Sequence, residues 1–201
     1  LQLLRHGAVS GDDVVLVGDR DLFARAVDLL GPTAAERDAL HFAPADPEAD
    51  PEHGHIPEIA AIATAVRGCQ QGRFGAVCTG PIHKAHLLQR GFPHPGHTGY
   101  LAHLCGLPPD EAVMAFFGGQ LAVTLATVHV PLSQVPTRLT SSAIVRVGRA
   151  GADVLRARFG VATPRVAVCG LNPHAGEDGE LGDEEARIVA PAIASLQREG
   201  V

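Results

Sequence analysis

Short apolar runs alternate along the chain with longer stretches in which the apolar residues recur at helical spacing. The strand-sized runs are residues 14–17, 74–78 and 164–169, with a further pair, 113–117 and 121–128, that flanks a glycine pair as in a hairpin. Helical periodicity covers residues 20–30, 56–71, 140–158 and 183–197. Strands that alternate with helices indicate an α/β fold with a largely parallel sheet, to which the hairpin adds an antiparallel pair.

The two ends of the chain fall inside predicted elements. Residues 1–8 have the pattern of the last part of a helix, and the last predicted helix ends close to Val201. The chain begins with Leu1, and its only methionine is Met114. We therefore expect residues 1–201 to be a partial α/β domain. A polar, proline-rich loop is predicted over residues 43–55.

Composition narrows the class of protein. The 201 residues are 46% hydrophobic and 19% charged, as is typical of globular proteins, and the formal net charge is -6. Without a basic patch to neutralise phosphates, nucleic-acid binding is disfavoured. The apolar runs are far shorter than the roughly 20 residues of a membrane-spanning helix. We expect a cytoplasmic protein that binds neither nucleic acid nor membrane.

The four cysteines are spread out and include no Cys-x-x-Cys pair, which argues against a zinc cluster and a disulfide scaffold. Cys78 and Cys169 lie in apolar runs. We expect them to be small buried hydrophobic residues in a reducing compartment.

Ligands of open α/β sheets bind beyond the carboxyl ends of the strands, and polar motifs follow three predicted strands here. The first motif, residues 79–84 (Thr-Gly-Pro-Ile-His-Lys), ends in Lys84, the only lysine among sixteen basic residues. Free N–H groups at the start of the following helix, together with the ammonium group, could hold an anion. A simple helix-capping turn with a solvated lysine is an equally good interpretation.

Histidines follow the other two strands. His129 comes directly after the run 121–128, and His174 lies in residues 171–177 (Leu-Asn-Pro-His-Ala-Gly-Glu), after the run 164–169. A single histidine is more often structural than a ligand, but two at equivalent strand ends could share a divalent metal. At least one further ligand must then come from elsewhere.

A third candidate is the pair His97-Thr98, in a loop ahead of a predicted helix. These side chains offer donors and acceptors suited to a carboxylate or hydroxyl ligand. The alternative is that Thr98 only caps the helix.

Four motifs occur here in the order found in one enzyme family. They are residues 79–84, 96–98 (Gly-His-Thr), 127–132 (Thr-Val-His-Val-Pro-Leu) and 169–177 (Cys-Gly-Leu-Asn-Pro-His-Ala-Gly-Glu). On these motifs the chain resembles 4-hydroxythreonine-4-phosphate dehydrogenase over essentially its whole length. The last motif is the most specific, followed by Gly-His-Thr.

The resemblance implies an isocitrate/isopropylmalate-dehydrogenase-like two-domain α/β fold and a homodimer with active sites at the subunit boundary. It implies oxidation and decarboxylation of 4-phosphooxy-L-threonine to 3-amino-2-oxopropyl phosphate, in pyridoxal phosphate biosynthesis. The cofactors would be NAD or NADP and a divalent metal (zinc, magnesium, cobalt or manganese). In the family three histidines bind the metal, and two of them match His129 and His174. The substrate-binding His-Thr pair matches His97 and Thr98.

The chain also departs from the family pattern. The family's first strand would precede Leu1, and its C-terminal third, with the third metal ligand and the phosphate- and cofactor-binding residues, would follow Val201. Gly99 stands where the family usually has Glu. Two alternatives therefore stay open: a related dehydrogenase for another phosphorylated hydroxy acid, such as 4-phosphothreonate, and a non-catalytic fragment of such an enzyme.

Overall fold

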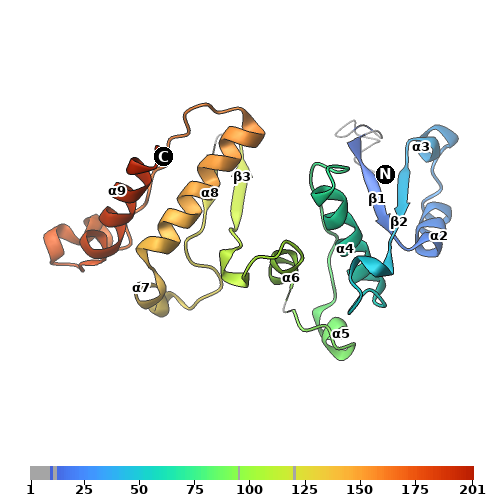
Figure 1. Cartoon of the computed structure of the whole chain (residues 1–201), viewed down its shortest axis with the longest axis horizontal. Helices are drawn as coiled ribbons and strands as arrows, with labels where there is room; N and C mark the ends of the chain where they lie inside the picture. The colour runs from blue at the N-terminus through green and yellow to red at the C-terminus, as the bar shows by residue number, and fades with distance from the viewer. Residues whose placement is uncertain (1–9, 11–12, 95, 120) are drawn as a thin grey trace. The chain divides into compact units, whose positions relative to one another are not determined.

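The structure, a computed structural model, describes residues 10, 13–94, 96–119 and 121–201 (Figure 1). The chain divides into two compact units, Leu1–Pro109 and Asp110–Val201. The helix end expected at residues 1–8 lies outside the described residues.

The first unit is built on a parallel strand pair. Its elements are β1 (Val15–Gly18), α2 (Arg20–Leu30), α3 (Ala34–Asp38), β2 (His41–Pro44), η2 (Pro47–Ala49), α4 (Pro57–Gln70), α5 (Lys84–Gln89) and α6 (His97–Leu104). Val15 pairs with His41 at one end of the ladder and Gly18 with Pro44 at the other. Helix α4 packs against β1, and Figure 1 shows α2 and α3 on the other side of the strand pair.

Local signals define the helices of this unit. Asp19 accepts the Leu22 N–H at the start of α2, which ends at Gly31 in the left-handed conformation. Thr33 and Glu36 form a capping box at α3. The apolar face of α4 supplies three of the seven residues of the core, which consists of Ile56, Ile59, Ile62, Val66, Leu87, Phe92 and Tyr100.

The second unit combines a hairpin with two packed helices. Its elements are β3 (Ala115–Gly118), β4 (Leu121–Thr124), η4 (Leu132–Gln134), α7 (Val135–Arg138), α8 (Ser141–Phe159), η5 (Pro173–Gly179), the π-helical turn η6 (Glu185–Val189) and α9 (Ala190–Arg198). The short η3 (Pro109–Glu111) spans the boundary between the units. The hairpin is antiparallel, with Ala115 opposite Thr124. Helix α8 packs against η6 and α9 around Ile144, Ile188, Val189 and Ala192.

Most of the predicted elements are confirmed, and the fold class is α/β. The helices and the first strand lie where the periodicity placed them, although α9 is preceded by a π turn. The hairpin is present, but its second strand, predicted over residues 121–128, ends at Thr124, so His129 does not directly follow a strand. The start of the loop predicted over residues 43–55 is instead the end of β2, which runs to Pro44. Proline tolerates that position because it is the last residue of the strand.

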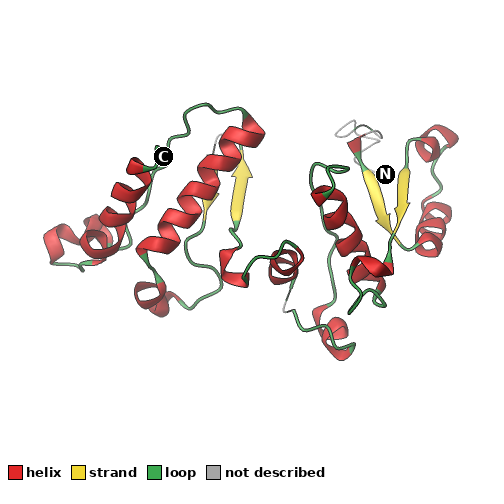
Figure 2. Ribbon diagram, viewed as in Figure 1, coloured by secondary structure: helices red, strands yellow, loops and turns green. Residues whose placement is uncertain are grey.

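The strands predicted at residues 74–78 and 164–169 are wrong. Both segments are loop in the structure (Figure 2), since neither joins a ladder with another described segment. An apolar run becomes a strand only when a second segment accepts and donates its backbone hydrogen bonds. For the same reason the prediction that Cys78 and Cys169 are buried is wrong. Both are exposed, because the runs that carry them are not covered by another strand.

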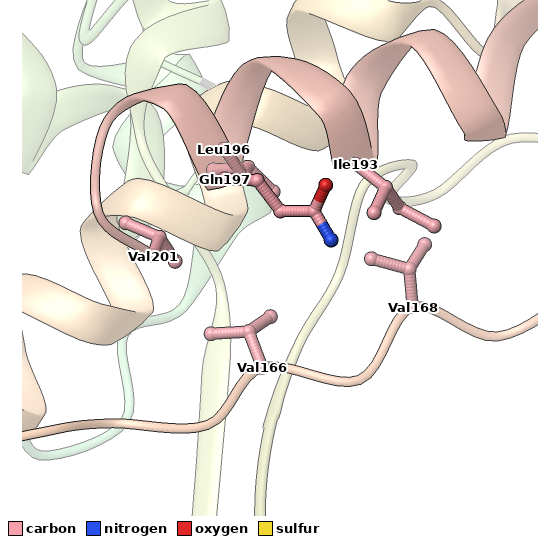
Figure 3. Close-up of a pocket in the computed structure, with 6 residues that line it drawn as sticks. All are labelled: Val166, Val168, Ile193, Leu196, Gln197 and Val201. Atoms are coloured by element: carbon pink, nitrogen blue, oxygen red, sulfur yellow. The ribbon is translucent and has the colours of Figure 1, made fainter.

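The segment that contains Val166 and Val168 lies beside α9 (Figure 3). The two enclose a groove of about 100 Å³, whose lining residues are Val166, Val168, Ile193, Leu196, Gln197 and Val201. No titratable side chain lines it, so the groove carries no acid–base or metal chemistry. Within the described residues no helix is long and apolar enough to cross a membrane.

Close packing of α8 on α9 depends on Gly148, and this gives a stability prediction. A Cβ at Gly148 would lie 2.8 Å from Leu196 Cδ1. Gly148→Ala is therefore expected to lower the free energy of unfolding by about 1–3 kcal/mol, the usual effect of overpacking. In the middle of an uncrowded helix the same change would stabilise by roughly 0.5–1 kcal/mol. Urea denaturation measures the difference.

The matched control is the same substitution in a Leu196→Ala background, where the added methyl group meets free space. There Gly148→Ala should be neutral or stabilising. An equal loss in both backgrounds would show that the contact with Leu196 is not the cause.

Candidate functional site

The sequence-predicted site residues are divided between the two units. Lys84, His97 and Thr98 belong to the first unit, and His129 and His174 belong to the second. The structure therefore describes two half-sites, each within its own unit.

The first half-site is the start of α6. The helix begins at His97, its N-cap is Gly96, and no side chain caps it. Thr98 thus lies inside the first turn, with an exposed side chain, and the interpretation of Thr98 as the cap is wrong. The first backbone N–H groups of a helix have no partner within the helix, so this turn offers donors to an anionic ligand.

Two side chains add to these donors. His97 Nε2 is buried and has no hydrogen-bond partner among the described residues. The end of Lys84 approaches Gly96: its Cε and Nζ atoms lie 3.5 and 3.6 Å from the position that a Cβ on Gly96 would occupy. The lysine predicted to act at the start of its own helix therefore points to the start of the next one. The structure brings motifs 79–84 and 96–98 together.

Helix α6 is anchored by a buried hydrogen bond that the sequence did not reveal. The Tyr100 hydroxyl donates to Asp50 Oδ2 over 2.6 Å, and the two residues are only 1% and 7% exposed. Asp50 Oδ1 accepts two further bonds, from the backbone N–H groups of Glu52 and His53. Because Tyr100 is one turn after His97, this contact fixes the part of α6 that carries the predicted substrate-binding pair.

Burial and the hydrogen bond between Tyr100 and Asp50 shift the pKa of both side chains. Burial raises the pKa of Asp50, but the hydrogen bond from Tyr100, those from the backbone and the charge of His53 together lower it below its ordinary value. Burial and the hydrogen bond to Asp50 raise the pKa of Tyr100 far above its ordinary range. The pair is thus a carboxylate and a neutral phenol at neutral pH.

Histidine rings surround Tyr100. His94 lies 5.2 Å from the tyrosine ring and 5.0 Å from the ring of His103, and Phe92 completes the group. Burial, followed by the charges of His103 and His53, lowers the pKa of His94. His94 and His103 thus pack around the anchor.

The second half-site is marked by its backbone. His129 has φ of 57° and His174 has φ of 50°, so both motif histidines adopt the left-handed conformation that favours glycine. Both side chains are exposed. Such backbone strain persists only where the surrounding structure holds it, and it gathers at functional sites.

Carboxylates hold the loop that carries His174. Glu185 Oε1 accepts the N–H groups of Leu171 and Asn172, each at 2.7 Å, and Glu185 Oε2 accepts the Asn172 side-chain amide at 2.9 Å. The same amide donates to Glu184 Oε2 at 2.7 Å. The backbone and side-chain hydrogen bonds from Asn172 lower the pKa of Glu185 to about 2, so this carboxylate stays ionised at neutral pH.

The described residues contain no group of three or more His, Cys, Asp or Glu side chains arranged to hold a metal ion. His129 and His174 provide two imidazoles, which are suitable ligands for a divalent first-row metal. The donor types fit the group that the sequence suggested, and a complete coordination shell needs further ligands.

The chain is similar to known proteins over most of its length. The family model of the pyridoxal phosphate biosynthetic protein PdxA matches residues 12–201. A 4-hydroxythreonine-4-phosphate dehydrogenase of Bradyrhizobium diazoefficiens is 49% identical over 146 residues, which are 71% of this chain and 42% of that protein. One from Xanthobacter autotrophicus is 42% identical and covers 86% of this chain and 53% of its own length. The chain thus spans about half the length of these relatives.

Solved structures similar to this chain are also dehydrogenases. The crystal structure of 4-hydroxythreonine-4-phosphate dehydrogenase from Klebsiella pneumoniae matches with a TM-score of 0.78 and 34% identity, over 96% of this chain and 64% of that chain. A terephthalate 1,2-cis-dihydrodiol dehydrogenase from Burkholderia xenovorans matches with a TM-score of 0.61 and 29% identity, over 74% of this chain and 47% of its own. Dehydrogenases with different named substrates therefore share this fold.

The Tyr100–Asp50 anchor predicts a dependence of stability on pH at both ends of the scale. Since the pKa of Asp50 is lowered by folding, its contribution is complete above the ordinary aspartate pKa of about 4 and is lost as the pH falls further. Since the pKa of Tyr100 is raised, its contribution is complete below the ordinary tyrosine pKa of about 10 and is lost as the pH rises further. Tyr100 is the only tyrosine and the chain has no tryptophan, so tyrosinate absorbance reports this group alone.

Tyr100→Phe serves as the control. It should lower the free energy of unfolding at neutral pH by about 1.5–3 kcal/mol, the range for a hydrogen bond to a charged group, and should remove the Tyr100 contribution to the alkaline loss. A wild-type Tyr100 that titrates near pH 10 while the chain is folded would contradict the buried hydrogen bond.

Proposed function

The chain belongs to the family of the pyridoxal phosphate biosynthetic protein PdxA, and from this premise we propose that it carries part of the active site of a 4-hydroxythreonine-4-phosphate dehydrogenase. The proposed reaction is the NAD-dependent, divalent-metal-dependent oxidation and decarboxylation of 4-phosphooxy-L-threonine to 3-amino-2-oxopropyl phosphate. The observation that carries the proposal is the left-handed backbone at both motif histidines, His129 and His174. By resemblance, the complete enzyme is a cytoplasmic homodimer with its active sites at the subunit boundary.

In this proposal the start of α6 binds the substrate. His97 Nε2 is buried without a hydrogen-bond partner among the described residues, so a bound polar group would satisfy it, and the Thr98 hydroxyl is exposed in the same turn. Lys84 Nζ adds a positive charge beside Gly96 that suits an anionic group of the substrate. These donors would orient the substrate for hydride transfer.

His129 and His174 would supply two of the metal ligands, and the third lies outside this chain. When bound, a divalent ion lowers the pKa of the substrate hydroxyl and stabilises the negative charge left by the departing carboxyl group. NAD or NADP supplies the hydride acceptor. The residues of this chain would contribute metal ligands and would orient the substrate. The left-handed backbone at His129 and His174 would fix the direction in which each imidazole leaves the chain.

One observation favours a second function. Gly99, in the first turn of α6, stands where the family usually has Glu, so a carboxylate is missing beside the proposed substrate site. A site without that carboxylate suits a substrate that lacks the cationic amino group of 4-phosphooxy-L-threonine, such as 4-phosphothreonate. A non-catalytic fragment is the third alternative. Such a fragment could still bind a metal ion or an anion, so binding is measured separately from turnover.

The metal assignment is tested by calorimetric titration of the chain with Zn²⁺ and Mn²⁺. One ion is expected per chain. His129→Ala and His174→Ala should each weaken binding more than the roughly 10–100-fold that the loss of an outer-shell partner costs. His55→Ala, which removes an exposed histidine of the first unit, should leave binding unchanged.

Binding that survives both substitutions would contradict the assignment of these ligands. A chain that binds no ion at all would show that the two histidines need the ligand outside this chain.

The anion assignment is tested with 4-phosphooxy-L-threonine and 4-phosphothreonate as probes. Tyr100 lies one turn from His97 and is the only tyrosine, so its fluorescence reports binding at the start of α6. Lys84→Ala should weaken binding by about tenfold or more, the effect of losing one charge-assisted hydrogen bond. Tighter binding of 4-phosphothreonate would favour the second function.

Arg37→Ala is the matched control, because it removes an exposed positive charge elsewhere in the same unit. Equal affinities of the unsubstituted chain and the Lys84→Ala variant would mean that the lysine is only solvated.

A further inference from the structure

Most of the residues in the turn that carries His174 are strained. Residues 174–178 all have positive φ, between 46° and 84°, and only Gly176 among them is a glycine. A run of left-handed residues is unfavourable for every L-amino acid with a side chain. The turn therefore requires specific contacts that hold it in this conformation.

Those contacts converge on one side chain. Glu185 accepts two successive backbone N–H groups through Oε1 and the Asn172 amide through Oε2, so that both carboxylate oxygens bond to the segment just before the turn. Glu184 accepts one bond, from the same Asn172 amide. Backbone bonds also close the turn, from the Ala175 N–H to the Asn172 carbonyl and from the Leu181 N–H to the Gly176 carbonyl. Among the side chains that the structure describes, Glu185 accepts the most hydrogen bonds from this loop.

Two glycines allow the loop to close over the carboxylates. A Cβ at Gly176 would lie 2.6 Å from the Gly182 carbonyl oxygen and 3.1 Å from Glu185 Oε2. A Cβ at Gly182 would lie 2.6 Å from both Asn172 Nδ2 and Glu184 Oε2. The turn is therefore in direct van der Waals contact with the groups that hold it.

Glu185 belongs to an element that is packed into the core of the second unit. It is the first residue of the π turn η6, whose Ile188 and Val189 are buried in the core of the second unit. The Ile188 carbonyl accepts the Ser141 hydroxyl at the start of α8 over 2.8 Å. π turns are rare and frequently occur at functional sites. A continuous series of contacts thus runs from α8 through η6 and Glu185 to the turn that carries His174.

We propose that Glu185 is a positioning residue for His174: its carboxylate holds the left-handed turn that presents the imidazole to a divalent ion. This inference rests on the proposed function for the ligand role of His174. The hydrogen bonds by which Glu185 holds the segment before the turn, here called the tether, can be measured without any metal. Glu185 acts here through the backbone and does not touch the ion.

The test replaces Glu185 with Gln, which keeps the size of the side chain and puts an NH₂ donor among groups that are themselves donors. The control is Glu180→Gln, which removes an exposed carboxylate from the same loop and so reproduces the change in charge. Amide hydrogen exchange, followed by NMR, is measured at Leu171 and Asn172. Exchange at both amides should become at least about tenfold faster in Glu185→Gln and stay unchanged in Glu180→Gln.

The second readout is Co²⁺ affinity, followed by the visible absorption of the bound ion. Glu185→Gln should weaken binding by about 10–100-fold, the range for outer-shell partners of a metal ligand, with Glu180→Gln close to the unsubstituted chain. His174→Ala is measured in parallel, because its effect tests the proposed function directly.

The outcomes separate the two claims. Unchanged exchange in Glu185→Gln, or equal acceleration in Glu180→Gln, overturns the tether. Wild-type Co²⁺ affinity in Glu185→Gln, with affinity lost in His174→Ala, overturns the positioning role and leaves the proposed function standing. Co²⁺ binding that His174→Ala does not weaken overturns the ligand role itself. An unsubstituted chain that binds no Co²⁺ overturns the positioning role for this chain, and the exchange measurement then tests only whether Glu185 holds the turn.

Discussion

Each half of the candidate site depends on one carboxylate used in the same way. Asp50 accepts two successive backbone N–H groups on one oxygen and the Tyr100 hydroxyl on the other. Glu185 accepts two successive backbone N–H groups on one oxygen and the Asn172 amide on the other. An irregular segment has no ladder to satisfy its N–H groups, and an ionised carboxylate is the strongest acceptor that a side chain can offer. The carboxylate also ties that segment to a second side chain.

A carboxylate that binds two backbone N–H groups and one side chain explains how a loop can hold a candidate site residue in a fixed direction. Asp50 joins the loop after η2 to α6, and so it fixes the helix whose first turn contains His97. Glu185 joins the segment before η5 to η6, and so it fixes the turn that contains His174. In both cases the candidate site residue is a few positions from the anchored one. The anchors and the residues they hold belong to the same unit.

Elements defined by neighbouring residues could be predicted from the sequence. Asp19 and Thr140 each bond to an N–H group three residues on, and the helices they begin, α2 and α8, lie where the periodicity placed them; the short helix α3, which the Thr33–Glu36 box begins, was not predicted. The apolar runs at 74–78 and 164–169 were recognised correctly as apolar, but whether a run becomes a strand depends on a distant segment that pairs with it. That information is not local, and the two predicted strands are loops.

The candidate site shows the same limit. The motifs identified His97, Lys84 and both histidines of the second unit, because residue types and order are visible in the sequence. The approach of the Lys84 side chain to Gly96, at the start of the next helix, could not be read from the sequence. Asp50 and Glu185 were missed because they lie 50 and 13 residues from the side chains they bind. The only available hint was that Tyr100 is the only tyrosine, and a buried hydroxyl needs a partner.

Local anchoring has a consequence for a chain that spans about half the length of its relatives. The start of α6 needs only Asp50 and the core of the first unit, and the His174 turn needs only Glu185 and the core of the second. Neither contact requires residues outside this chain. The geometry of each half-site can therefore be measured on this chain separately from turnover. The backbone geometry around His97 and His174 is accordingly the property of this chain that its own contacts determine.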